Sequence, residues 1–288
     1  MLEALEATHA DSAVTALDLV APPLAPGRVR WLQDRIDDLD ALERARLPEY
    51  DLVFHLASVP GGLAEREPGL GRRVNLDASL DLFDRLASGG RRPRVVYASS
   101  IAVYGEVDDA PVGAETPTRP ASSYGTHKRM TEMALADHTR RGDISGVAVR
   151  LPGLIARPER AAGFGSAFMS ELPRAVAAGR SYVCPVSPQA VAWWMSVSCA
   201  AANLAHAAIA NTCGNLQLPA LRLSVAEIVD CLARIYGEER RALVSFRPDP
   251  RVERDFGRFP ALATAREEAL GFVHDGDATN LLQKALNA

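Results

Sequence analysis

Short apolar runs alternate in the first half of the chain with longer segments of helical periodicity. The runs are rich in β-branched residues and almost continuously apolar, as buried parallel strands are. They cover residues 13–18, 51–57, 94–98 and 147–151. Apolar residues recur at helical spacing over 75–86 and 124–138, and each segment is followed by glycine, where helices commonly end. This alternation predicts βαβ units and an α/β fold with a doubly wound parallel sheet.

The pattern changes in the second half of the chain. Loops rich in proline, glycine and alanine surround two adjacent tryptophans and a helical segment over 224–236. We expect residues 1–151 to form the sheet domain. Residues 152–288 should form mainly a smaller lobe over the carboxyl ends of the strands, where ligands of such sheets bind. Tryptophans more often pack than stack on ligands, so we assign packing to both.

Composition narrows the class of partner. The 288 residues carry a formal net charge of -4, with acidic and basic residues interspersed, so no basic face for nucleic acid or anionic lipid is indicated. The start shows no leader pattern and no stretch is apolar enough for a membrane span. The four cysteines lack metal-ligand spacing. We expect a cytoplasmic protein with a small-molecule partner, no nucleic acid, no membrane and no metal.

The strongest chemical signal is the run Tyr124-Gly125-Thr126-His127-Lys128. Positions four apart share a face of a helix, so the phenol and the ammonium address the same small volume. A neighbouring positive charge lowers the pKa of a tyrosine from about 10 and makes it a general base. Lysine occurs only here and at Lys284 among 32 basic residues, which indicates a need for a compact cation. His55 and His127 are assigned packing rather than proton relay.

A pair of hydroxyls, Ser99 and Ser100, follows the strand predicted at 94–98. Side chains at the carboxyl end of a parallel strand lie where ligands of these sheets bind. A serine there can hydrogen-bond a substrate oxygen and orient it toward a base. We choose Ser100, with Ser99 as its neighbour. Such serines are also ordinary turn residues, so the assignment depends on their position upstream of Tyr124.

Further motifs accompany these residues in a fixed order. They are His55-Leu56-Ala57 at a strand end, Val74-Asn75 at a helix start, and Tyr104-Gly105 after the two serines. From about residue 13 to about residue 235 the set resembles the signature of the extended short-chain dehydrogenases, the NAD-dependent epimerase/dehydratase family. The resemblance implies a Rossmann-like NAD-binding domain over 1–151 and a substrate-binding lobe after it.

The resemblance also implies catalytic roles. In this family the tyrosine is the acid/base, the lysine lowers its pKa and holds the nicotinamide ribose, and the serine positions the reacting carbinol. These roles fall on Tyr124, Lys128 and Ser100. Asn75 matches the asparagine that supports the lysine through a water relay. We therefore expect hydride transfer between an alcohol carbon and a nicotinamide cofactor.

Residues for the dinucleotide follow from the same resemblance. Asp18 matches the acid that binds the adenosine ribose hydroxyls. A carboxylate there repels a 2′-phosphate, so NAD is expected rather than NADP. Asp34 matches the residue beside adenine. Besides Asn75, Tyr124 and Lys128, the residues expected to line the dinucleotide are Leu56, Ala57, Ser58 and Ser99.

The beginning of the chain departs from the family pattern. A dinucleotide fold opens with a strand, a glycine-rich turn and a helix, whereas no glycine precedes Gly27 here. The glycines at 61–62 and 69–71 follow a later strand and do not substitute. We expect the first strand, central in the usual order, and about twenty residues in all to be lacking. A late start or a fragmentary sequence explains this more simply than a truncated form, which would be unstable or a pseudoenzyme.

Residues 150–153 bear on the substrate. Nucleotide-sugar members of the family carry Arg-x-Phe/Tyr-Asn at this point, whereas this chain has Pro152 and Gly153. The chain is more similar to the branch that oxidises the C2 hydroxyl of a four-carbon sugar acid, D-erythronate, to the 2-oxo acid with NAD. That branch has an arginine where this chain has Val191. Arg157, or another arginine, is a candidate to pair the substrate carboxylate instead.

We therefore expect an NAD-dependent oxidoreductase that acts on a secondary alcohol of a small sugar acid. Two alternatives stay open. One is a sugar epimerase or dehydratase, in which the cofactor is reduced only transiently. The other is a non-catalytic truncated homologue that keeps the scaffold. Helix pairing between subunits is common among relatives, so the resemblance allows a homodimer.

Overall fold

A computed structural model describes residues 1–8, 11–20, 29–155 and 165–286. Its largest sheet has four parallel strands in the order β3-β4-β5-β9. Their bounds are β3 (Leu52–His55), β4 (Arg94–Ser100), β5 (Ser145–Leu151) and β9 (Gly214–Gln217). β3 is shorter than the run predicted at 51–57, so Leu56 and Ala57 lie just beyond its carboxyl end.

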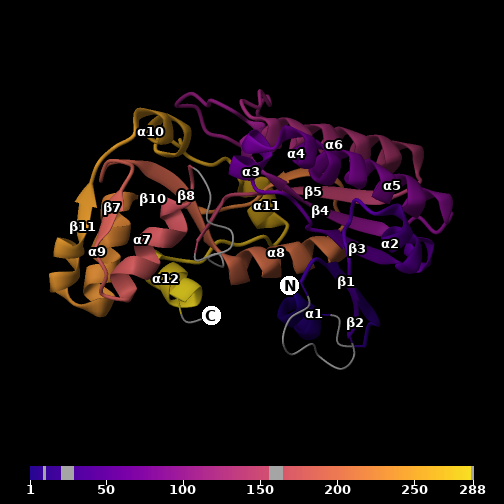
Figure 1. Cartoon of the computed structure of the whole chain (residues 1–288), viewed down its shortest axis with the longest axis horizontal. Coiled ribbons are helices and arrows are strands. Elements are labelled where there is room, and N and C mark those ends of the chain that lie inside the picture. Colours follow the sequence, from indigo (N-terminus) through magenta and orange to yellow (C-terminus); the bar gives the residue numbers. More distant parts are fainter. Residues whose placement is uncertain (9–10, 21–28, 156–164, 287–288) are drawn as a thin grey trace.

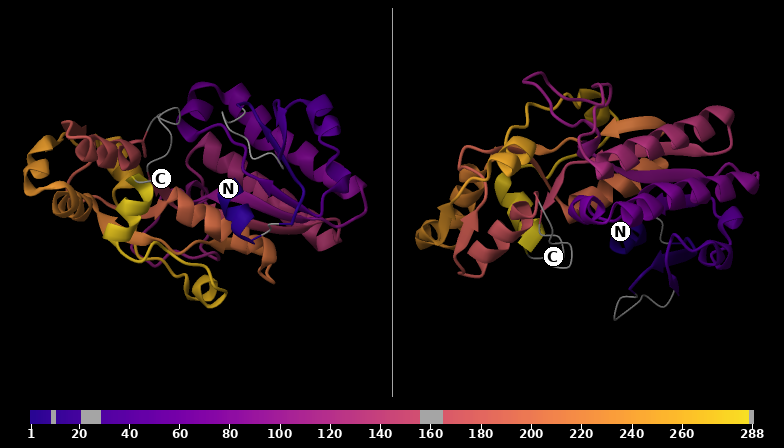
Figure 2. Two further views of the ribbon diagram at one scale, coloured as in Figure 1. Left: turned by 90° about the horizontal axis from the view of Figure 1, so that it is seen from below. Right: turned by 45° about the horizontal axis from the view of Figure 1, so that its top comes forward.

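Helices cover both faces of this sheet (Figures 1 and 2). On one face are α5 (Ala78–Ser88) and α6 (Ser123–Arg141), and on the other is α8 (Val197–Ile209). Successive side chains of a strand point to opposite faces. Tyr97 of β4 therefore packs with Phe83 of α5, whereas its neighbour Val96 packs with Leu204 of α8. The predicted α/β class and doubly wound parallel sheet are confirmed.

The N-terminal strands form a separate parallel pair, β1 (Val14–Asp18) with β2 (Val29–Gln33). α1 (Leu2–Thr8) contacts α8. α2 (Leu39–Arg44) contributes Leu42 to the core beneath α5. Within the described ranges, no strand is hydrogen-bonded to the remaining edge of β1 or of β3. The expected lack of a first strand between these edges stays a prediction.

Two helices confirm the periodicity of the sequence and extend it. α6 starts after Ser122, which accepts a hydrogen bond from the Gly125 N–H. It ends at Gly142, whose φ of 85° lies in the left-handed region that favours glycine. The helix predicted over 75–86 begins two residues earlier, with a π-turn over Arg73–Asp77, and continues as α5. Such wide turns are frequent at functional sites.

The second part of the chain lies beside the sheet (Figure 1). Its strands are β6 (Gly153–Ile155), β8 (Val191–Ser196) and β10 (Leu221–Ser224) in one sheet, and the pair β7 (Tyr182–Cys184) and β11 (Val244–Phe246). Around them pack α7 (Phe168–Ala177), α9 (Val225–Tyr236) and α12 (Ala278–Leu286). Trp194 is buried in their core, and Trp193 stacks on Phe259 in a neighbouring cluster. The packing role and the helix over 224–236 are as predicted.

The predicted division into residues 1–151 and 152–288 stays a prediction. Both α8 and β9 follow residue 152. Nevertheless, β9 is a strand of the four-stranded sheet and α8 packs against this sheet. The short elements are η1 (Leu47–Glu49), α3 (Gly61–Arg66), α4 (Pro68–Arg72), η3 (Ile101–Val103), η5 (Glu238–Leu243), α10 (Pro250–Phe256) and α11 (Ala265–Ala269). No helix that the structure describes combines the length and the apolar character that a bilayer crossing requires.

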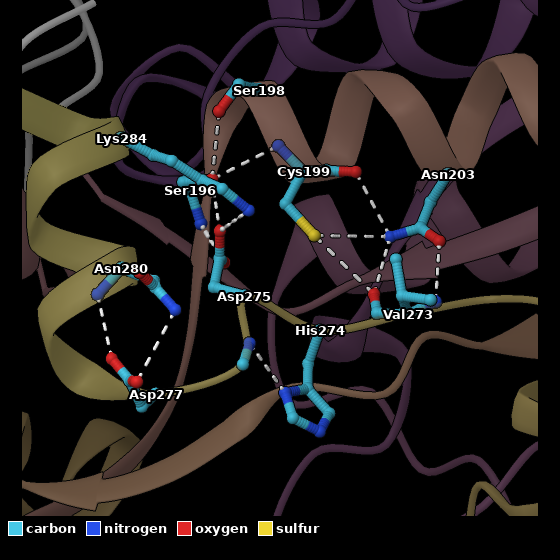
Figure 3. A network of polar contacts seen from close by, with 11 residues as sticks. Ser196, Ser198, Cys199, Asn203, Val273, His274, Asp275, Asp277, Asn280 and Lys284 are labelled. Atoms are coloured by element: carbon cyan, nitrogen blue, oxygen red, sulfur yellow. Dashed lines mark hydrogen bonds and ion pairs between the residues drawn. The ribbon is translucent and has the colours of Figure 1, made fainter.

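Polar contacts hold the C-terminal segment against α8 (Figure 3). The buried Asp275 accepts hydrogen bonds from the backbone N–H of Ser196 at 2.8 Å and from its Oγ at 2.7 Å. Lys284 Nζ lies 3.4 Å from the same carboxylate. Asn203 donates to the carbonyl of Val273 at 2.8 Å and accepts from its N–H at 3.0 Å. Because α12 packs on α7 and α9, this segment joins the second part to the helix that covers the sheet.

Candidate active site

A close approach of two backbones brings the turn after β4 against the first turn of α6. Gly125 lies so near this turn that a Cβ there would be 2.3 Å from the carbonyl oxygen of Ala102. Only glycine fits such a contact without a shift. Ser100 starts the turn and Tyr124 precedes the glycine, so this contact places the predicted serine and tyrosine on adjoining segments.

Lys128 is almost fully buried, with 2% of its surface exposed. Its Nζ donates a hydrogen bond to the Ala98 carbonyl at 2.8 Å. It also lies 5.6 Å from the centroid of the Tyr124 ring and 4.8 Å from that of Tyr97. The structure therefore brings the predicted tyrosine and lysine together at the carboxyl end of β4, with the ammonium near the faces of two phenol rings.

Burial determines the protonation states of Lys128 and of His55 near it. Loss of solvation lowers the pKa of Lys128 to about 7, and the negative charge of Glu132 opposes that shift. Burial, followed by the charge of Lys128, lowers the pKa of His55 to about 3. His55 is thus neutral at physiological pH, stacks on Tyr97 and hydrogen-bonds Ser79 at 2.8 Å. These contacts support the packing role expected for it.

The two serines have different surroundings. Ser100 is half-buried, and its Oγ accepts a hydrogen bond from the Ala102 N–H at 3.1 Å. That contact uses a lone pair and leaves the O–H for donation to a substrate oxygen. Ser99 is buried, and its hydroxyl donates to Glu132 at 2.6 Å. Its expected contact with the dinucleotide stays a prediction.

Asn75 holds the loop that follows β3. Its side-chain oxygen accepts from the Val59 N–H at 2.7 Å and from the Ser58 hydroxyl at 3.1 Å, and its nitrogen donates to the Val59 carbonyl at 3.0 Å. Its backbone carbonyl accepts from the Thr131 hydroxyl of α6 at 3.2 Å. Asn75 thus links this loop to the helix that carries Lys128, although its side chain is engaged with Val59.

Glu132 and Arg150 form a buried ion pair that sequence reasoning missed. The guanidinium donates to both carboxylate oxygens at 2.9 Å. It also donates to the Tyr104 hydroxyl at 3.1 Å and to the Ala114 carbonyl at 2.8 Å. The spacing of Tyr124, Lys128 and Glu132, each four residues after the last, is the signal that marks the glutamate as part of the same helix face. Its partner is 18 residues further along the chain.

The acids expected at the adenosine end lie together at the carboxyl ends of β1 and β2. The Asp34 N–H donates to the Asp18 carbonyl at 3.0 Å. The Asp18 carboxylate accepts from the Val20 N–H at 3.1 Å. A hydrogen bond from the Arg35 backbone and another from the Arg44 side chain hold the pKa of Asp34 below its usual value. The side-chain oxygens of both acids can accept hydrogen bonds from hydroxyl or amino donors.

The chemistry of these groups fits a nicotinamide dinucleotide at both of its ends. An ammonium has three donors, and one of those on Lys128 goes to Ala98 in the described structure, so the others could hold ribose hydroxyls. The carboxylate of Asp18 could accept from the hydroxyls of the other ribose. Leu56, which is 38% exposed, and the half-buried Ala57 and Ser58 form the loop after β3, between these ends in sequence. Arg157, the expected partner of a substrate carboxylate, lies outside the described residues.

A doubly wound parallel sheet with a tyrosine and a buried lysine at the carboxyl end of a central strand defines a Rossmann-like oxidoreductase. The sequence confirms this class. The chain belongs to the NAD dependent epimerase/dehydratase family, whose sequence profile matches residues 4–198. It is accordingly an enzyme with a nicotinamide cofactor, as the resemblance implied.

Curated relatives and solved structures agree with this assignment. The chain is 36% identical over 277 residues to a D-erythronate dehydrogenase of Cupriavidus necator, covering 94% of this chain and 86% of the relative. A D-erythronate dehydrogenase of Haemophilus influenzae is 28% identical over 92% of this chain and 87% of its own. The structure resembles a nucleoside-diphosphate-sugar epimerase of Agrobacterium tumefaciens with a TM-score of 0.85 and 31% identity, over 95% of this chain and 84% of that one. An L-threonine dehydrogenase of Clostridium difficile, at 17% identity and a TM-score of 0.84 over 98% of this chain and 91% of its own, shares the fold.

Proposed function

We propose that this enzyme oxidises the C2 hydroxyl of a small sugar acid, D-erythronate or a close analogue, to the 2-oxo acid with NAD. The observation that carries the proposal is the 36% identity, over 94% of the chain, to the dehydrogenase of Cupriavidus necator. Pro152 and Gly153 support it, because nucleotide-sugar members have a different pattern at this position.

The proposed mechanism assigns one task to each side chain. Tyr124 takes the proton of the substrate hydroxyl, and the Lys128 ammonium beside its ring favours the phenolate. The Ser100 hydroxyl donates a hydrogen bond to the same substrate oxygen and orients the carbinol carbon. NAD, when bound, supplies the acceptor for the hydride.

The remaining predicted residues bind the cofactor in this proposal. Lys128 donates to the nicotinamide ribose, and Asp18 accepts from the adenosine ribose hydroxyls and repels a 2′-phosphate, which favours NAD over NADP. Asp34 lies beside adenine. The loop of Leu56, Ala57 and Ser58 lines the dinucleotide, and Asn75 supports it by holding the Val59 peptide.

Replacing the proposed base tests the mechanism. Tyr124→Phe removes the phenolic oxygen and keeps the ring, so NADH formation from D-erythronate should fall about 10³-fold, the range that a general base contributes. Tyr236→Phe is the matched control, because this half-buried tyrosine packs in the core of the second part. A Tyr124→Phe variant that turns over at the native rate would refute the assignment.

A sugar epimerase is the second candidate, favoured by the similarity to the Agrobacterium tumefaciens structure. An epimerase regenerates its cofactor in every turnover, whereas a dehydrogenase releases reduced cofactor. Incubating the protein with NAD and either D-erythronate or a nucleotide sugar separates the two. Accumulating NADH with the sugar acid supports the dehydrogenase, and an inverted sugar without net NADH supports the epimerase.

A further inference from the structure

A buried carboxylate lies one helical turn beyond the proposed catalytic lysine. Tyr124, Lys128 and Glu132 follow one another at intervals of four residues on α6, so their side chains share one face. The Glu132 side chain is 0% exposed, and Lys128 is 2% exposed. The mechanism above uses the tyrosine and the lysine and assigns no task to the glutamate.

Both charged groups are anchored to consecutive residues of β4. Lys128 Nζ donates to the Ala98 carbonyl at 2.8 Å, and Glu132 accepts from the Ser99 hydroxyl at 2.6 Å. Arg150 of β5 holds the same carboxylate with two hydrogen bonds of 2.9 Å. Arginine stays protonated in proteins, so the buried carboxylate of Glu132 is paired with a cation.

The other groups around the ammonium bring no negative charge at neutral pH. His55 on β3 is neutral, because burial lowers its pKa to about 3. Tyr97 on β4 lies beneath the ammonium, and burial raises its pKa well above the usual value. Tyr124 on α6 is the proposed base, and Arg150 on β5 is a cation. Among the described residues, the anion that acts on Lys128 is Glu132.

We propose that Glu132 is a positioning residue that keeps Lys128 protonated within an enclosure whose burial favours the neutral amine. Burial alone lowers the pKa of Lys128, and the carboxylate raises it again. The cation beside Tyr124 then persists near neutral pH, where the phenolate is needed. The inference rests on the proposed function for the role of Lys128, but the protonation state itself is measurable without substrate.

The chain offers a direct readout, because Lys128 and Lys284 are its only lysines. Isotope-labelled lysine gives two side-chain NMR signals, and Lys284→Arg identifies which belongs to Lys128. The pH titration of that signal reports the protonation midpoint of Lys128. In Glu132→Gln, which keeps the shape and removes the charge, we expect the midpoint to fall by about one pH unit. An unchanged midpoint would overturn the proposal.

Two further variants separate charge from packing. Asp137→Asn is the matched control, since it neutralises an exposed acid on the same helix, and the Lys128 midpoint should not move. Ser99→Ala removes a hydrogen bond to Glu132 and retains its charge, so the midpoint should stay near the native value. If Ser99→Ala lowers the midpoint as much as Glu132→Gln does, packing is responsible and the proposal is wrong.

Glu132→Gln leaves Arg150 buried without its partner, and loss of one member of a buried pair strongly destabilises proteins. The double variant Glu132→Gln/Arg150→Gln removes both charges and serves if the single variant does not fold. Its Lys128 midpoint should lie below that of Arg150→Gln alone, because these two variants differ only in the anion that acts on Lys128. Equal midpoints in the two folded variants contradict the proposal, whatever substrate the enzyme accepts.

Discussion

Replacing Gly125 with alanine tests the contact that sets the first turn of α6 against the segment after β4. The added Cβ would lie 2.3 Å from the Ala102 oxygen, 3.0 Å from its carbonyl carbon and 3.1 Å from the Pro120 Cβ. The nearest of these is backbone, which cannot rotate away as a side chain can. Ordinary contact distances of about 3.5 Å therefore require a displacement of about 1 Å.

This displacement has two expected consequences. Alanine favours a helix interior over glycine by about 0.5–1 kcal/mol, but overpacking costs about 1–3 kcal/mol, so the free energy of unfolding should fall by about 1–2 kcal/mol. Tyr124 moves with the helix relative to Ser100. Because a misplacement of about 1 Å costs about 10²-fold in rate, kcat/KM for NAD reduction by D-erythronate should fall by about that factor.

Urea denaturation measures the first effect and NADH formation the second. Gly69→Ala in α4 is the matched control, since its added Cβ would meet only the Arg73 guanidinium, at an ordinary 3.6 Å. That variant should gain about 0.5–1 kcal/mol in stability and keep the native rate. If Gly125→Ala also gains stability and keeps its activity, the close approach does not position the tyrosine.

Two more predictions concern Asn75 and Lys128. Asn75→Ala removes the side-chain partner of the Val59 N–H and of its carbonyl, which retains only a long hydrogen bond of 3.4 Å from the Ser58 hydroxyl among the described contacts. The free energy of unfolding should therefore fall by about 2–4 kcal/mol, and KM for NAD should rise without a change in the pH profile. A changed pH profile with unchanged KM would favour the water relay instead. Lys128→Met should stabilise the protein most below pH 7. Burial depresses the pKa of Lys128 from 10.5 in the unfolded chain to about 7 in the fold, so the unfolded chain binds more protons between these values and native stability rises with pH across this window. In urea titrations, the difference in free energy of unfolding between Lys128→Met and the native protein should therefore shrink by up to about 1.4 kcal/mol per pH unit from about pH 7 to about pH 10. A difference that stays constant with pH would contradict the lowered pKa of Lys128.

Local patterns account for the parts of the fold that the sequence predicted. The strands at 94–98 and 147–151 and the helix over 124–138 occur where their periodicity placed them, because the face that a residue presents depends on its near neighbours. The proximity of Tyr124 and Lys128 could be predicted for the same reason, since one helical turn separates the two residues. Boundaries were less accurate, as β3 ends at His55 and the π-turn extends the helix before α5.

Contacts between distant segments required the structure. The sequence showed Asn75 as a family residue, but only the fold shows its side chain on the Val59 peptide. The sequence likewise showed two adjacent serines, and only the fold shows that the Ser99 hydroxyl donates to the buried Glu132 carboxylate. The sequence indicated no role for the second lysine, Lys284, whereas the structure shows its ion pair with Asp275.

The sequence by itself therefore determined the fold class, the order of strands and helices, and the phenol and ammonium on one helix face, because each of these follows from residues within a few positions of one another. Only the tertiary structure decided how protonated that ammonium is. It is buried against Ala98 and Tyr97 of β4 and lies beside Tyr124 of α6, and the carboxylate that opposes the loss of solvation is paired with an arginine from β5. Burial and charge pairing depend on distances in space, which the spacing along the chain does not contain.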